Sequence, residues 1–226
     1  MSLKETIAEI KRGSRKPSCF QDLFNLQSKL DGVLAPRQKR EREVTDICMS
    51  MLAEVIEFQE ETKISHKTWG KKEFNEDDMK VEAIDILFFY CQLVNHMNIP
   101  SDYEYEVMGG TKVIDIEGRF IEFVNTTKEL LEYRKESGED FDDYAGIFGL
   151  ISTVATAPEY LRKRFAKANQ EDRRAIITTL LLIIGDLGAI YGSLGMDTEE
   201  IYSRYFQKWN ENLDRVGKGK DGKGWL

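Results

Sequence analysis

Residues 81–94, VEAIDILFFYCQLV, are the stretch that decides the fold. On a helical wheel they are apolar on almost every side, which is typical of a helix buried in a protein core. Glu82 and Asp85 nevertheless stand three positions apart on one face of this helix, with Phe89 beside them. Because an unpaired buried carboxylate is costly or loses its charge, something positive must meet these two acids. That partner is either a metal ion or a structural Lys or Arg.

A second acidic pair, Glu54 and Glu57, lies in an amphipathic stretch predicted to be helical over residues 41–62. Twenty-four residues separate Glu57 from Glu82, which is enough chain to reverse direction and bring the two pairs together. Taken alone, an acidic stripe of this kind is also typical of a solvated helix face. Four facing carboxylates would favour a hard cation, Mg²⁺ or Mn²⁺, shared with substrate phosphates.

The composition is that of one globular domain spanning residues 1–226. A net charge of -8 argues against a nucleic-acid partner and against adhesion to an anionic membrane. Two histidines are too few for an imidazole-rich zinc or di-iron site. The three cysteines form no CxxC motif, so we expect a cytoplasmic protein with reduced thiols.

Helical periodicity continues through most of the chain, and we predict an all-α, multi-helix bundle. A short hairpin fits residues 108–118, and Pro158 is expected to kink or break a helical region. We expect the tail, residues 216–226, to be flexible because it is rich in Gly and Lys. The predicted helices are residues 20–30 (stopping near Gly32), 41–62, 76–98, 119–135, 141–168, 170–192 and one starting after Asp197.

Residues 175–196 are apolar over about the length of a membrane span. Asp186 lies in the middle of this segment, and no aromatic belt flanks it. We therefore expect a buried core helix or a subunit-interface helix rather than a span.

Two basic clusters could neutralise an anionic substrate. Lysines surround Trp69 in the loop between the acidic pairs, and others run from Lys208 into the tail. Both clusters are equally compatible with a solvated basic surface, and Trp69 could either stack on a base or plug the loop into the core.

Together these motifs resemble the all-α, MazG-like nucleoside triphosphate pyrophosphatases, and they are most similar to the dimeric dUTPases, including phage-type members. The resemblance rests on Glu-x-x-Glu, 24 residues, then Glu-x-x-Asp, with a Lys/Trp loop between. Leu26-Gln27 and Leu30-Asp31 match the group's Leu-Gln…Leu-Asn motif except at the last position. Lys208, Asn212, Arg215 and a glycine-rich segment match its C-terminal motif. Residues 100–200 match only as further helices.

The resemblance implies hydrolysis of dUTP to dUMP and pyrophosphate by a metal-activated water, in a homodimer. Two or three Mg²⁺ ions, or Mn²⁺, would be bound by Glu54, Glu57, Glu82 and Asp85, with Glu54 activating the water. The implied substrate-binding residues are Gln27, Asp31, Trp69 and Phe89 around the nucleoside, Lys208, Asn212, Arg215, Lys220 and Lys223 around the phosphates, and Lys71 in the Lys/Trp loop.

Asp31 stands where the family motif has Asn. An ionised carboxylate only accepts hydrogen bonds, whereas an Asn side chain can also donate them. An acceptor suits the amino group of cytosine, so dCTP is an alternative or additional substrate. Two further functional hypotheses remain open at this point. The first is a housecleaning pyrophosphatase with broader nucleotide choice, and the second is a non-catalytic helical interaction protein.

Overall fold

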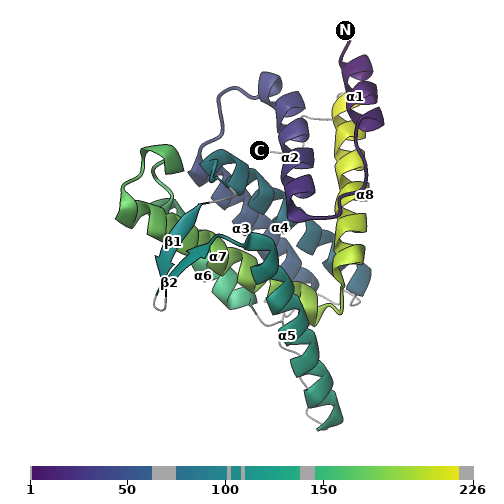
Figure 1. Cartoon of the computed structure of the whole chain (residues 1–226). Helices are drawn as coiled ribbons and strands as arrows, with labels where there is room; N and C mark the ends of the chain where they lie inside the picture. Colours follow the sequence, from purple (N-terminus) through teal and green to yellow (C-terminus); the bar gives the residue numbers. More distant parts are fainter. Residues whose placement is uncertain (1, 63–74, 101–102, 108–109, 138–145, 219–226) are drawn as a thin grey trace.

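The fold is that of a computed structural model, which describes residues 2–62, 75–100, 103–107, 110–137 and 146–218 (Figure 1). The architecture is all-α, as predicted, with one antiparallel two-stranded hairpin. In chain order the elements are α1 (Leu3–Arg12), α2 (Phe20–Leu34), η1 (Ala35–Arg37), α3 (Val44–Glu61), α4 (Glu76–Met97), β1 (Glu104–Val107), β2 (Gly110–Val113), α5 (Ile116–Glu136), α6 (Ile147–Tyr160), η2 (Phe165–Lys167), α7 (Gln170–Ser193) and α8 (Thr198–Gly217).

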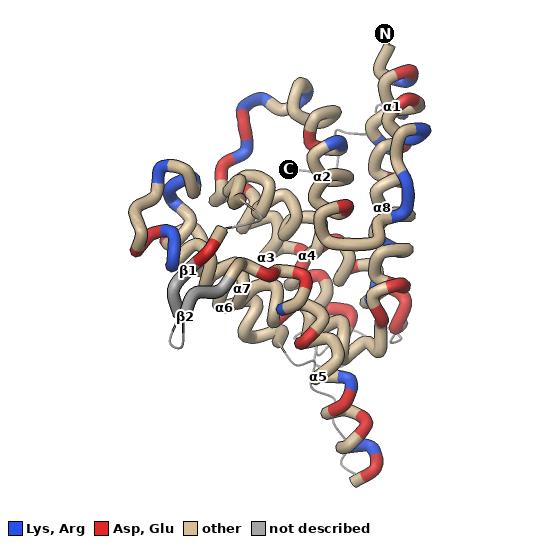
Figure 2. The backbone as a smooth tube through the Cα atoms, in the orientation of Figure 1, with Lys and Arg blue, Asp and Glu red and all other residues tan. Residues whose placement is uncertain are grey.

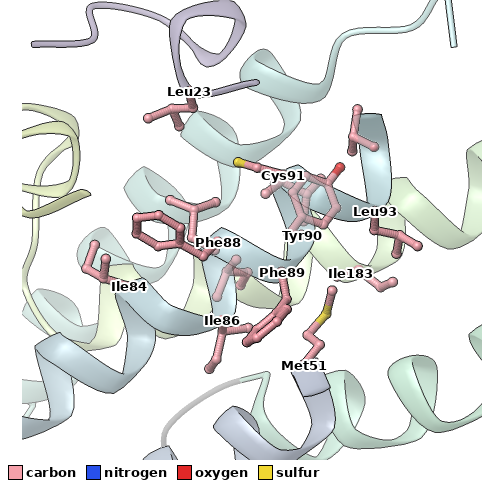
Figure 3. Close-up of a cluster of buried hydrophobic side chains, with 14 of the residues drawn as sticks. Leu23, Met51, Ile84, Ile86, Phe88, Phe89, Tyr90, Cys91, Leu93 and Ile183 are labelled. Atoms are coloured by element: carbon pink, nitrogen blue, oxygen red, sulfur yellow. The ribbon is translucent and has the colours of Figure 1, made fainter. Parts of the chain in front are cut away.

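The helix α4 is the centre of the molecule, because it packs against α2, α3, α7 and α8. Figure 3 shows its aromatic and aliphatic side chains pointing in several directions, toward Leu23, Met51 and Ile183 of three other helices. This arrangement confirms the prediction of a helix that is apolar on all sides and therefore buried.

Helices α1, α2 and α8 form one side of the molecule, with α1 alongside α8 (Figure 1). The indole Nε1 of Trp209 in α8 donates to the Leu26 carbonyl oxygen in α2, at 2.7 Å. The ring of Tyr205 stacks on Phe88 of α4, with centroids 4.1 Å apart. These contacts bring the last helix of the chain onto the face of α4 that carries its acids.

Helix α7 packs against α4, while α5 packs on α7 and α6 packs on both α3 and α7. Helices α5 and α7 approach each other closely at two glycines. A Cβ atom added to Gly188 would lie 2.7 Å from the Phe120 carbonyl oxygen, and one on Gly192 would lie 2.6 Å from that of Val124. By length and composition α7 could cross a membrane, but 72% of its most apolar window is buried within the chain. This burial agrees with the core-helix expectation.

Several element boundaries differ from the predictions. Helix α2 passes through Gly32, because buried Leu30 and Val33 outweigh the helix penalty of a single glycine, about 1 kcal/mol. Helix α1 was not predicted, although Ser2 and Glu5 form a capping box at its start. The hairpin starts earlier than predicted, at residue 104.

The remaining predicted boundaries mostly hold. Helix α6 contains Pro158 and ends two residues after it, so the helical region predicted to reach residue 168 stops at Tyr160 and only the short η2 follows. Helix α7 begins after its predicted cap, Asn169. Helix α8 also starts as predicted, with the Asp197 side chain accepting from the Glu200 backbone N–H. Helix α8 extends through Gly217, so the first residues of the predicted flexible tail are helical. Residues 219–226 lie outside the described part of the chain.

Candidate active site

The acidic site lies where α3 packs against α4, and Figure 2 shows red acidic segments on both helices in the middle of the view. Glu54, Glu82 and Asp85 each place one carboxylate oxygen within 4.8 Å of the others. All three side chains are half-buried. Glu57 is exposed and lies outside this group of three. The packing of α3 and α4 therefore brings together three of the four predicted metal ligands.

The three clustered carboxyls disfavour their own ionisation. Burial, followed by the negative charges of Asp85 and its neighbours, raises the pKa of Glu54 to about 8. The same two causes raise the pKa of Glu82 to about 7. Burial raises the pKa of Asp85, although the nearby Lys208 ammonium opposes the effect. A cluster of this kind attracts a cation, because a positive charge relieves repulsion that water only partly screens.

Lys208 of α8 supplies one positive charge to the cluster. Its Nζ lies 2.6 Å from Oδ2 of Asp85, and both side chains are largely buried. Lys208 therefore provides part of the positive charge that the acids of α4 need. The ammonium group marks a position where the site accommodates positive charge, and its long stem allows it to move aside.

Asn212 and Arg215 follow Lys208 along α8 at helical spacing. Asn212 is 1% exposed, and neither of its amide atoms meets a hydrogen-bond partner among the described residues. A buried amide without protein partners is unusual and costs stability, which is typical of a group that a ligand satisfies. Arg215 is exposed, and its charge lowers the pKa of Asp85, which places it within electrostatic reach of the acids.

Three of the predicted nucleoside-binding residues are described, with Phe89 on α4 and with Gln27 and Asp31 on α2, which packs against α4. The ring of Phe89 is buried beneath the Arg42 guanidinium, 5.3 Å from its centroid. Gln27 is 4% exposed, and its Nε2 donates to Oδ1 of Asp31 at 2.9 Å. The amide of Gln92 donates to the same oxygen at 2.8 Å.

Sequence reasoning missed Gln92, Arg42 and Tyr205 as neighbours of the site. Gln92 carried a usable signal, because it is polar in an apolar helix and stands seven positions after Asp85, on the same face. Arg42 and Tyr205 gave no comparable signal. Four of the predicted substrate-binding residues, Trp69, Lys71, Lys220 and Lys223, lie outside the described residues.

A protein-family model described as dUTPase matches residues 19–219 of the chain. The chain belongs to this dUTPase family. It is accordingly a nucleoside triphosphate pyrophosphatase of the dUTP diphosphatase kind, and the hypothesis of a non-catalytic interaction protein falls away. The match includes residues 100–200, for which the motifs gave no specific resemblance. No curated protein and no solved structure matches the chain.

Proposed function

We propose that this dUTPase-family protein hydrolyses dUTP to dUMP and pyrophosphate in a Mg²⁺-dependent reaction at the cluster of Glu54, Glu82 and Asp85. The observation that carries the proposal is the convergence of three carboxylate oxygens within 4.8 Å, on two packed helices. All the ligand atoms of this cluster are oxygens, and oxygen ligands favour Mg²⁺ and, second to it, Mn²⁺. Glu57 would complete the set from the exposed rim and allow two or three ions to bind.

Bound Mg²⁺ would supply Lewis-acid charge neutralisation to the phosphates and lower the pKa of the attacking water. We assign the role of general base to Glu54, which is half-buried on α3 and faces the two carboxyls of α4. Glu82 and Asp85 are held more rigidly by the buried helix α4 and would serve as ligands only.

Side chains of α8 would bind the phosphates. Lys208, released from Asp85, would neutralise a phosphate oxygen. The Asn212 amide, which meets no partner among the described residues, would donate to another. Arg215 would contact the outermost phosphate from its exposed position. Lys220 and Lys223 of the tail would add charge to the same group.

The nucleoside would lie along α4, with its sugar against Phe89 and its base toward Gln27 and Asp31. A buried phenyl ring beside the sugar leaves an added 2′-hydroxyl without a partner, which favours deoxyribose. Trp69 and Lys71 would close the pocket from the loop between α3 and α4. A dCTP pyrophosphatase, or a housecleaning enzyme with broader choice, would use the same metal site and differ only in this pocket.

A homodimer would cover exposed apolar side chains of α3 and α6, two helices that pack against each other. On α3, Met49 is 60% exposed and Ile56 36%, and on α6 Phe148 is 68% exposed and Tyr160 52%. Contact with a second copy would remove these large apolar side chains from water. Light scattering coupled to gel filtration measures the mass directly, and a 26.1 kDa particle would contradict the dimer. We place the enzyme in the cytoplasm, in line with its three unpaired cysteines.

The reaction is tested by pyrophosphate release from dUTP, dCTP, dTTP and UTP, with Mg²⁺ and with a chelator. We expect Mg²⁺-dependent release from dUTP and its loss in Glu54→Gln. The matched control is Glu129→Gln, which changes an exposed glutamate on α5. Release that continues in the chelator, or in Glu54→Gln, would refute the metal-site mechanism.

A further inference from the structure

A chain of hydrogen bonds that joins three helices and the segment before α3 ends at the Asp31 carboxylate. The Tyr205 hydroxyl donates to Gln27 Oε1 at 3.1 Å, and Gln27 Nε2 donates to Asp31 Oδ1 at 2.9 Å. From the other side, Arg42 donates to Gln92 Oε1 at 3.2 Å, and Gln92 Nε2 donates to the same Asp31 oxygen at 2.8 Å. The result is one carboxylate oxygen that receives two amide donors.

The direction of these bonds is fixed by chemistry. Arg42 has donors only, so the Gln92 side chain must turn its carbonyl to Arg42 and its amino group to Asp31. Arg42 is itself held in place, because its guanidinium also donates to the Ser50 hydroxyl and stacks on Phe89. Both amides bind Oδ1, and Oδ2 of Asp31 makes no hydrogen bond to the described residues, so Oδ2 retains its capacity to accept one.

Asp31 also stands at the correct end of the site. Gln92 follows Asp85 by seven residues, so it lies on the same face of α4 and about 10 Å along the axis. Phe89 lies between them on that face. A nucleotide whose phosphates lie at the acids and whose sugar lies on Phe89 would therefore present its base to Asp31.

We propose that Asp31, positioned by Arg42 and Gln92, accepts a hydrogen bond from the exocyclic amino group of cytosine, so that the enzyme hydrolyses dCTP at least as efficiently as dUTP. This inference rests on the proposed pyrophosphatase reaction and specifies its base. Cytosine presents an amino donor at the position where uracil presents a carbonyl acceptor. An ionised carboxylate pairs with the donor and opposes the carbonyl.

The test compares kcat/KM for dCTP and dUTP in Mg²⁺, for the full-length protein and its variants. We expect Asp31→Asn, which is isosteric and can donate, to lower the dCTP-to-dUTP ratio at least tenfold. Gln92→Leu and Arg42→Met should lower the ratio severalfold by releasing Asp31, whereas Arg42→Lys should restore part of it. A merely structural role would reduce both activities without changing their ratio.

The control is Thr179→Val, which removes a buried hydroxyl from α7 and should leave the ratio unchanged. An unchanged ratio in Asp31→Asn, with dUTP hydrolysis retained, would overturn the inference while leaving the proposed function intact. Failure of the unmodified protein to release pyrophosphate from any deoxynucleotide would instead overturn the proposed function.

The unmodified protein provides a second test. Burial raises the pKa of Asp31 to about 6, against the opposing effects of both amides and the Arg42 charge. The titratable groups that act with it are Arg42 before α3, Cys91 on α4 and Tyr205 on α8. Ionisation of Asp31 converts a donor into an acceptor, so the dCTP-to-dUTP ratio should rise between pH 5 and pH 7. The metal site is common to both substrates and cancels in the ratio, and a flat ratio would overturn the inference.

Discussion

Replacement of Glu54 by Gln should stabilise the metal-free protein at alkaline pH while abolishing its activity. The pKa of Glu54 is about 8 in the folded protein, against 4.5 for a free glutamate side chain. The folded state therefore binds more protons than the unfolded chain between these two values. Stability falls as pH rises through this window, and the full penalty is present above pH 8.

The size of the effect follows from the same two values. Converted at about 1.4 kcal/mol per pKa unit, the difference gives an upper bound of about 5 kcal/mol. Glu54 is only half-buried, so solvent screening reduces this bound, and we expect a gain of about 2 kcal/mol in Glu54→Gln at pH 8.5. For a chain of this length that gain raises Tm by about 4 to 8 °C.

Thermal unfolding monitored by circular dichroism, in EDTA and in Mg²⁺, measures the effect at pH 5 and pH 8.5. We expect the variant to gain stability only at the higher pH and only without metal, because Mg²⁺ stabilises the wild-type cluster. Glu129→Gln is the control and should shift Tm little under either condition. Equal Tm values for Glu54→Gln and wild type at pH 8.5 in EDTA would refute the account of a mutually repelling cluster.

Three further predictions follow from contacts elsewhere in the site and the core. Asn212→Leu should stabilise the nucleotide-free protein by about 1–2 kcal/mol, because it removes a buried amide that has no partner in the described part of the chain. The same variant should raise KM for dUTP, and urea unfolding and steady-state kinetics measure the two effects. Lys208→Met should lower Tm in EDTA by leaving Asp85 without its ion pair, and Mg²⁺ should then raise Tm more than in wild type while activity stays low. Gly188→Ala should lower the free energy of unfolding by about 1–3 kcal/mol, because the added methyl group would collide with α5. Gly32→Ala should raise it by about 0.5–1 kcal/mol, because the space around Gly32 in α2 is open. Urea denaturation that ranks the two variants in the opposite order would contradict the packing argument.

Much of the architecture could be predicted from the sequence because it depends on local periodicity. The apolar run around Phe88 specifies a buried helix in any context, and the caps Asn169 and Asp197 specify where two helices begin. Spacing within each acidic pair likewise fixes which carboxylates share a helix face. Helix α1 shows the limit of this reasoning, since a short amphipathic segment forms a helix only when it packs on α8.

The sequence by itself determined an all-α chain with acids on a buried helix, and hence the need for a positive partner. Only the tertiary structure decided which groups meet those acids. It places Glu54 with Glu82 and Asp85, leaves Glu57 on the rim, and brings in Lys208 from 123 residues away. The hydrogen-bond chain to Asp31 was equally hidden, since its members come from three helices and from the segment before α3. Helical spacing orders side chains only along one helix, whereas their contacts across helices depend on packing angles and depths that the whole core sets together.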